Sequence, residues 1–178
     1  MRNVFVFGFL AALCASTAYA NSDAPLSERY PATAKFTGPV HMPDFRGRDR
    51  KFADLHTRIR EAIKAGPSFA GHYTIIGWGC GTECVDYVVA DVATGQVFRF
   101  PLSGEDYGEL QLGAKINSRL IVANWIADSD QRAPDNSLLQ NCLRQSFVWT
   151  GDKAVPLGKP AVIATVKWHD SDICFGGK

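Results

Sequence analysis

The sequence is most informative about the fold in the stretch Gly71-His72-Tyr73-Thr74-Ile75-Ile76-Gly77-Trp78-Gly79-Cys80-Gly81-Thr82-Glu83-Cys84. An apolar run from His72 to Trp78 predicts a β-strand. The residues that follow are rich in glycine and carry two cysteines, Cys80 and Cys84, four positions apart. Such a loop contributes little to a core, but a short disulfide would hold it in one exposed shape.

Further strands are predicted on the C-terminal side of this loop. The second runs from Val85 to Val92 and turns at Ala93-Thr94-Gly95, where Gly95 can take the positive φ that a hairpin turn requires. The other predicted strands are Gln96–Phe100, Leu110–Ile116, Arg119–Trp125, Leu143–Thr150, Lys153–Leu157 and Ala161–Trp168. Seven or eight short strands joined by tight turns indicate a mainly β, α+β fold: a curled antiparallel meander.

One helix is predicted on the N-terminal side, from Asp49 to Ala65. Its apolar residues recur at helical spacing, and Gly66-Pro67 ends it, because glycine followed by proline is typical just beyond a last helical turn. We expect this helix to pack on one face or end of the sheet. The apolar residues are Phe52, Leu55, Ile59, Ala62 and Ile63.

The first twenty residues have the pattern of a secretory signal peptide. Arg2 precedes the apolar run Val4–Ala15, and Ala18-Tyr19-Ala20 is a small-x-small cleavage signal. A lipid anchor at Cys14 is disfavoured because Leu13 precedes it. The predicted organisation is a signal peptide at 1–20, an extended arm at 21–47 and one β-rich domain at 48–178. A periplasmic or secreted location follows, with no membrane insertion after cleavage.

Charge gives no reason to expect nucleic acid or an anionic membrane as partner. Arg2 is one of 19 basic residues, so the chain beyond the signal peptide carries 18 basic and 18 acidic residues. A balanced surface provides neither the basic patch that phosphates require nor long-range attraction to an acidic bilayer.

The cysteine count favours two disulfides. Four of the five cysteines lie beyond the signal peptide, an even number suited to an oxidising compartment. Of the three possible pairings we favour Cys80–Cys84 with Cys142–Cys174, because the first two are held close by the chain. The alternative is a zinc site that adds His72 and His169 to the thiols. The disulfide interpretation implies no metal and no cofactor.

Two polar loops, Ser103–Glu109 and Asp128–Gln140, interrupt the predicted strands. Each carries three acidic residues, and carboxylates are the ligands that calcium prefers. Neither loop has the spacing of a hand-type calcium loop, so we interpret both as solvated loops. The acidic residues are Glu105, Asp106 and Glu109 in the first loop, and Asp128, Asp130 and Asp135 in the second.

Three blocks of the sequence resemble a set of uncharacterised exported bacterial proteins. The blocks are Gly66–Tyr73, Trp78–Cys84 and Asp91–Phe98, and the resembling proteins carry "GPNFAGHY", "WGCGTGC" and "D-x-x-TGKV" in the same order. Glu83 stands where those proteins have glycine. The resemblance implies export and the same segment boundaries, but it implies no activity.

Several catalytic arrangements are conceivable around the loop. A free Cys80 or Cys84 with His72 as base would suit acyl transfer, but pairing of the cysteines removes the thiolate. Redox chemistry of the thioredoxin type uses Cys-x-x-Cys at a helix start, and three residues intervene here. Glu83 and Asp86, or Asp170 and Asp172, could form the carboxylate pair of a glycosidase.

A binding module is the function that the sequence favours. A closed, glycine-rich loop is preorganised, so little conformational entropy is lost when it meets a partner. The predicted binding residues are Trp78, Thr82, Glu83 and His72, and the expected partner is an envelope or extracellular protein. Two alternatives remain: an envelope hydrolase that gathers His72 with Glu83 or Asp86, and a purely structural envelope protein. No catalytic residue is assigned.

Overall fold

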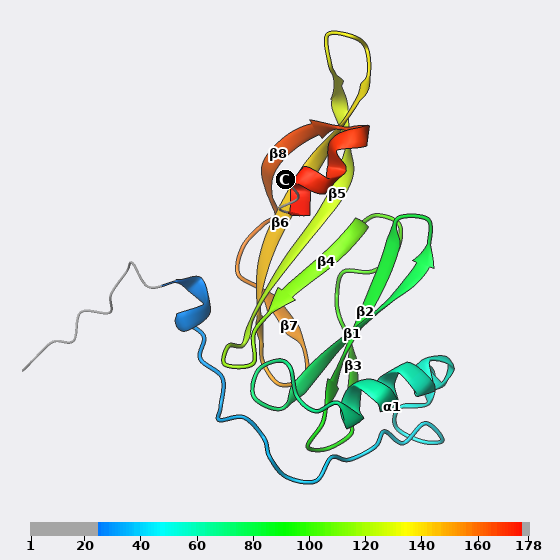
Figure 1. Cartoon of the computed structure of the whole chain (residues 1–178), viewed down its shortest axis with the longest axis vertical. Helices are drawn as coiled ribbons and strands as arrows, with labels where there is room; N and C mark the ends of the chain where they lie inside the picture. Colours follow the sequence, from blue (N-terminus) through cyan, green and yellow to red (C-terminus); the bar gives the residue numbers. More distant parts are fainter. Residues whose placement is uncertain (1–24, 176–178) are drawn as a thin grey trace, which may run out of the picture.

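The computed structural model describes residues 25–175, so the predicted signal peptide lies outside the described residues. Within this range the chain forms one antiparallel sheet of eight strands and a single α-helix (Figure 1). The predicted fold class, a curled antiparallel β-sheet with one N-terminal helix packed on it, is confirmed. The strands are β1 (Tyr73–Gly81), β2 (Cys84–Asp91), β3 (Val97–Arg99), β4 (Gly108–Ala114), β5 (Leu120–Arg132), β6 (Leu138–Trp149), β7 (Ala154–Pro156) and β8 (Ala161–Lys167).

The sheet branches at two strands. Its main order is β1-β2-β4-β5-β6-β7, while β3 pairs with β2 and β8 pairs with β6. Strand β6 pairs with β7 near Trp149 and with β8 nearer its start, between Leu139 and Arg144. Because β6 has different neighbours along its length, the sheet curls instead of forming a flat meander.

The segment Asp128–Gln140, predicted as a loop, is mostly strand. β5 continues to Arg132 and β6 starts at Leu138, and Asp128 pairs directly with Gln140. The prediction was wrong because this end of the hairpin is largely exposed and therefore lacks alternating apolar residues. The backbone N–H and C=O groups of this segment are hydrogen-bonded to the neighbouring strand, and this pairing does not depend on which side chains the strands carry.

The predicted helix contains two conformations. A 3₁₀ segment (Arg50–Leu55) leads into α1 (His56–Lys64). Phe52, Ile59 and Ile63 are buried against β1 and β2, in a cluster that includes Val88 and Val92. The Asp49 carboxylate accepts hydrogen bonds from the N–H groups of Val97 and Asp44 and makes no bond to the helix's own first turn. The helix is therefore tied to β3 at its start.

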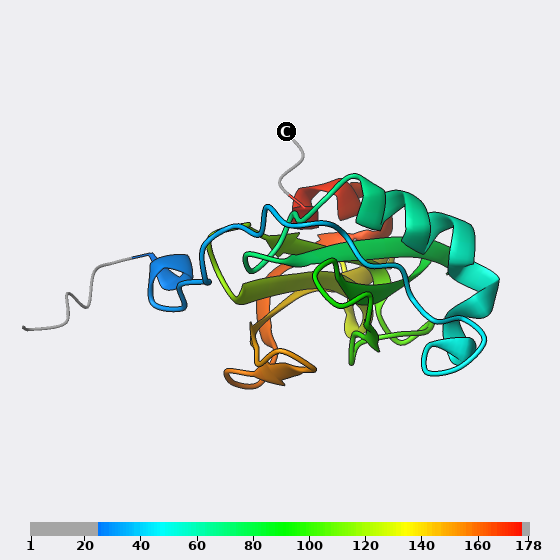
Figure 2. The same cartoon turned by 90° about the horizontal axis from the view of Figure 1, so that it is seen from below.

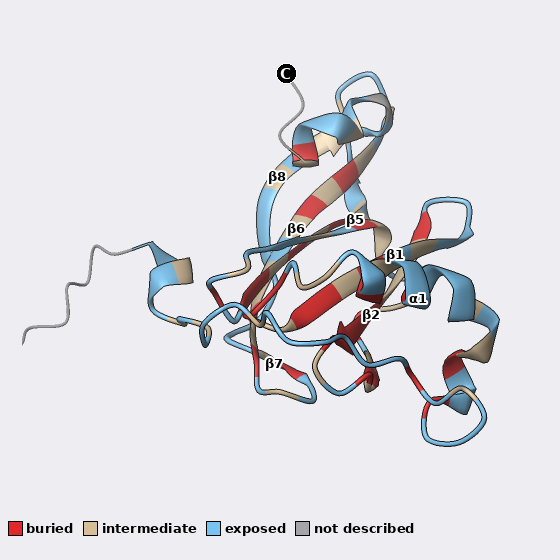
Figure 3. Cartoon of the chain, turned by 60° about the horizontal axis from the view of Figure 1, so that its bottom comes forward, coloured by how far each residue is buried: buried red, intermediate tan, exposed pale blue. Residues whose placement is uncertain are grey.

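The main core lies on the strands that surround Trp149. This side chain is fully buried, and Phe69, Tyr73 and Phe98 meet it edge to face, with ring centroids 6.3, 5.4 and 5.6 Å away. Such contacts between aromatic rings stabilise a core beyond the burial of area alone. Buried residues concentrate on the central strands, whereas the hairpin ends are exposed (Figure 3).

The segment that precedes the helix is hydrogen-bonded to residues in the loops at the ends of the strands. Its backbone N–H groups at Ala32, Phe36 and His41 donate to the carbonyls of Asn117, Gly71 and Val92 in turn. Figure 2 shows this segment running along the sheet, with α1 and the C-terminal 3₁₀ segment η3 (Trp168–Phe175) on the same side of the sheet.

Two disulfides link described residues. Cys80–Cys84 closes the end of the β1–β2 hairpin, and Cys142–Cys174 fastens η3 to β6. Cys84, Gly108, Ile126 and Cys142 are successive partners across β2, β4, β5 and β6. This row of cross-strand partners therefore begins and ends at a cysteine that forms a disulfide.

We predict that the two disulfides stabilise the protein unequally. In the chain-entropy model, the Cys142–Cys174 bridge, with a sequence separation of 32, contributes about 3–4 kcal/mol. The Cys80–Cys84 bridge spans four positions and contributes about 2 kcal/mol. Urea unfolding of Cys142→Ala/Cys174→Ala and of Cys80→Ala/Cys84→Ala, followed by tryptophan fluorescence, measures both losses. An equal or greater loss in the second variant would contradict this ranking.

Candidate functional site

The exposed end of the β1–β2 hairpin is the first part of the candidate site. Burial decreases along β1, from buried Tyr73 to exposed Gly81, and the turn residues Thr82 and Glu83 are both exposed (Figure 3). The Cys80–Cys84 disulfide closes the hairpin directly below this turn, with the two Cα atoms 5.1 Å apart. We call Thr82 and Glu83 together the hairpin tip. It is covalently fixed and accessible.

Glu83 and Glu109 both have a left-handed backbone. Their φ angles are +56° and +51°, in a region that glycine adopts far more easily than other residues. The Glu109 N–H donates to the Glu83 carbonyl oxygen at 2.6 Å, which joins the tip to the start of β4. Glycine at position 83 would suit this conformation without strain.

The environment of Glu109 is electrostatically unfavourable to its charged form. Burial is the largest cause that raises the pKa of its carboxyl, and the neighbouring charges of Glu83 and Asp172 raise it further. Burial penalises an ionised carboxyl, and adjacent negative charges add repulsion. Negative charge is therefore concentrated beside the tip, although the chain as a whole is nearly neutral.

Glu83 also lines a polar hollow of about 330 Å³, which we call the acidic hollow. It lies between the hairpin tip, the loop before β4 and the facing parts of β5 and β6. Gly108, which also lines it, allows β4 to approach β5 closely, because a Cβ there would lie 2.9 Å from Ile126 Cγ1. The polar residues that line it are Glu83, Glu105, Asp106, Asp128 and Gln140.

The acidic hollow brings together residues that lie far apart in the sequence. Glu105 and Asp106 belong to one predicted acidic loop, Asp128 to the other, and Glu83 to the hairpin. Gln140 was not recognised as a site residue. The signal that could have found it is its place opposite Asp128, but that pairing depends on strand register, which the polar sequence there does not reveal.

Trp78 does not belong to the exposed tip. It pairs with Asp86 within the hairpin, is half-buried and packs against the cluster beneath α1. Its indole therefore contributes to the attachment of the helix. Of the four predicted binding residues, Thr82 and Glu83 lie together at the tip, and Trp78 lies further along β1.

His72 lies at the opposite end of β1 from the tip. With nine residues in the strand, about 26 Å separates the Cα atoms of its first and last residues at the usual rise of about 3.3 Å per residue. The His72 Nδ1 is 2.8 Å from Asp91 Oδ1, and Asp91 also accepts from the Ala93 N–H and the Thr94 hydroxyl. The structure therefore places His72 with Asp91, away from Glu83.

Asp86 is engaged in holding a loop. Its carboxylate accepts from the Gly104 N–H at 2.9 Å and lies 3.7 Å from an Arg99 guanidinium nitrogen. The grouping of His72 with Glu83 or Asp86 that the hydrolase alternative requires is not formed. The histidine–carboxylate pair that does form, with Asp91, lies away from the disulfide loop.

The metal alternatives can be compared with the ligand geometry. Among the described residues, Cys80, Cys84 and Asp86 are the group whose ligand atoms lie within 4.8 Å of one another. The two sulfurs are joined in a disulfide and offer no thiolates for zinc. The surroundings of the His169 side chain, the other proposed ligand, lie outside what the structure describes.

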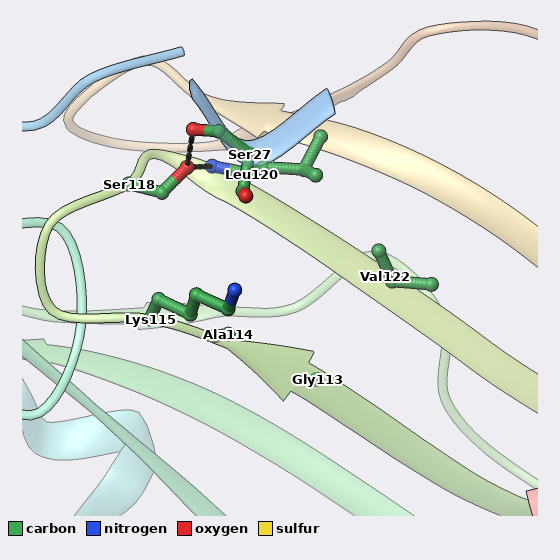
Figure 4. A pocket seen from close by; sticks show the side chains of 7 residues that line it. All are labelled: Ser27, Gly113, Ala114, Lys115, Ser118, Leu120 and Val122. Carbon is green, nitrogen blue, oxygen red and sulfur yellow. Dashed lines mark hydrogen bonds between the residues drawn. The ribbon is translucent and has the colours of Figure 1, made fainter. Parts of the chain in front are cut away.

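A different hollow, of about 370 Å³, lies beside β4, β5 and the short 3₁₀ segment η1 (Leu26–Glu28) (Figure 4). The Ser118 hydroxyl there donates to the Ser27 carbonyl oxygen and accepts from the Leu120 N–H. These bonds fasten η1 to the sheet. The lining is mostly apolar and offers no comparable cluster of charges.

Comparison with protein-family models, with curated proteins and with solved structures finds no match for this chain. Within residues 25–175, no helix has the length and apolar character needed to cross a membrane. The site must therefore be interpreted from its own chemistry.

We predict that Glu109 destabilises the folded protein at neutral pH. Because folding raises the pKa of its carboxyl above the ordinary value of 4.5, the folded state takes up its proton more readily than the unfolded chain does. The stability that Glu109 contributes is therefore present below pH 4.5 and is lost as pH rises through the folded-state pKa. Glu109→Gln should raise the free energy of unfolding at pH 7, and this gain should disappear near pH 4.

Urea unfolding at both pH values measures this gain. The same change on the exposed side of α1, Glu61→Gln, serves as the control and should show no comparable pH-dependent gain. A Glu109→Gln variant that is less stable than the wild type at pH 7 would contradict the prediction.

Proposed function

We propose that this protein is an exported binding module that engages a partner protein through the hairpin tip. The observation that carries the proposal is the combination of a disulfide-closed, exposed turn and an adjoining acidic hollow. Thr82 and Glu83 are the residues placed to make the first contact. The partner belongs to the cell envelope or the extracellular space.

Preorganisation supports this proposal. The Cys80–Cys84 disulfide restrains the hairpin, and the hydrogen bond from the Glu109 N–H holds the carbonyl of Glu83. A loop that is already ordered loses little conformational entropy on binding, so more of the contact energy appears as affinity.

Two independent observations support export. The first twenty residues have the pattern of a signal peptide, and the described chain carries two disulfides. Disulfides of this kind persist in oxidising compartments and are rare where thiols are kept reduced. The periplasm or the extracellular medium is thus the proposed location.

Binding is favoured over the two alternatives. A purely structural envelope protein would be expected to pack its loop against the sheet, whereas Thr82 and Glu83 are exposed and Glu83 lines a hollow. A hydrolase would require a reactive group beside the loop, whereas His72 lies with Asp91 at the far end of β1. Neither alternative accounts for the closed tip.

Site-specific photo-crosslinking in the producing cell tests the proposal. A photoreactive phenylalanine analogue in place of Thr82 should give a discrete adduct with one envelope or extracellular protein. The same analogue in place of Asp152, at the exposed turn between β6 and β7, should not give it. Equal adducts at both positions, or none at position 82, would refute the proposed binding face.

Competition then tests the role of the closed loop. Excess wild-type protein should suppress the position 82 adduct, whereas Cys80→Ala/Cys84→Ala should require about tenfold more protein, the effect of about 1.4 kcal/mol of added ordering cost. Thr82→Ala/Glu83→Gly should also compete poorly while remaining folded, since glycine suits the left-handed backbone at position 83.

A further inference from the structure

We infer that the acidic hollow receives an arginine side chain of the partner protein. This inference rests on the proposed function, because Glu83 belongs to both the hairpin tip and the hollow. A partner bound at the tip would therefore lie directly over the hollow. One mostly buried side chain, Gln140, and the charges that share the hollow with it support this inference.

Gln140 is a mostly enclosed polar side chain of the hollow. The residue is only 4% exposed, and its side-chain amide makes no hydrogen bond to any residue within the described range 25–175. Gln140 lines the hollow and is paired with Asp128 across β5 and β6, so the two side chains lie on the same face of the sheet. Among the described residues, Trp149 Nε1 is the buried side-chain polar atom without a partner, so the Gln140 amide atoms still reach the solvent of the hollow. A mostly enclosed amide that opens onto a hollow is therefore available to hydrogen-bond a ligand there.

The charges around Gln140 indicate that the ligand is a cation. Glu83, Glu105, Asp106 and Asp128 surround it, and none of these carboxylates forms a salt bridge or a side-chain hydrogen bond with another described residue. No lysine or arginine lines the hollow among the described residues. By contrast, Asp49, Asp86 and Asp135 each have a basic side chain within 4 Å.

The spacing of the carboxylates favours an extended cation over a metal ion. Calcium requires six to eight oxygens at about 2.3–2.6 Å. In the described part of the chain, no three acidic ligand atoms of the hollow lie within 4.8 Å of one another. A guanidinium is planar and spreads five N–H donors, so it can reach carboxylates on different walls and also the carbonyl oxygen of the Gln140 amide.

The space in the hollow is consistent with such a group. A volume of about 330 Å³ exceeds what a single ion requires. The occupied hollow would satisfy the Gln140 amide and would neutralise charge beside Glu109, whose carboxyl already has a raised pKa. Both effects favour occupation by a cation.

Titration of the purified, disulfide-bonded protein with N-acetyl-arginine amide tests the inference directly. The side-chain amide resonances of Gln140, followed by NMR, should shift in a saturable manner, and added salt should weaken the binding. The isosteric neutral probe, N-acetyl-citrulline amide, should cause no such shift. Asp128→Asn should weaken binding about tenfold, as expected for a lost charge-assisted hydrogen bond.

A matched control lies on the same strand. Asp130→Asn removes the same charge from β5, but Asp130 does not line the hollow, so affinity should change by less than about twofold. Gln140→Met keeps the size of the side chain and removes its acceptor, and it should also weaken the arginine probe. Since Asp128 is exposed, its variant keeps the test valid even if Gln140→Met fails to fold.

Several outcomes would overturn the inference. These are the absence of a saturable shift with the arginine probe, equal weakening by Asp130→Asn, and binding of calcium that displaces the probe. If the probe binds but Asp128→Asn leaves the position 82 crosslink unchanged, the hollow takes a free guanidinium compound and not a side chain of the partner. A position 82 crosslink without probe binding would leave the proposed function intact and reject only this inference.

Discussion

The rest of the structure depends on the long antiparallel pairing of β5 with β6. This ladder extends from Leu120 and Val148 at one end to Arg132 and Leu138 at the other. One end places Trp149 in the core, where aromatic rings surround it, and the other end places Asp128 and Gln140 in the hollow. Because backbone hydrogen bonds fix the register, a shift by one residue would move every one of these side chains to the opposite face.

The candidate site is assembled around this ladder by separate constraints. The Cys80–Cys84 disulfide closes the hairpin, the bond from the Glu109 N–H positions Glu83, and the Cys142–Cys174 disulfide fastens the C-terminal segment to β6. The result is a disulfide-closed turn beside a group of carboxylates that form no salt bridge with any residue that the structure describes. Burial and the neighbouring charges of Glu83 and Asp172 raise the pKa of Glu109 beside this turn, and a cation from a partner would offset that negative charge.

Sequence patterns predicted the fold wherever side chains alternate between a core and solvent. The helix and the strands around Val88 and Trp149 have such patterns, because their buried residues must be apolar. The exposed ends of β5 and β6 have no such signal, so Asp128–Gln140 was interpreted as a loop. The sequence placed Trp78 beside the loop for its binding role, but it did not reveal that the indole packs against the cluster beneath α1.

The sequence by itself determined the type of each main element and the closed glycine-rich turn that carries Thr82 and Glu83. These features arise from local spacing, such as apolar periodicity and two cysteines four residues apart. Only the tertiary structure decided that Glu83, Asp106, Asp128 and Gln140 surround one hollow, and that His72 instead pairs with Asp91. The physical reason is that cross-strand register brings together residues far apart in the chain, and exposed polar residues carry no pattern that encodes this register.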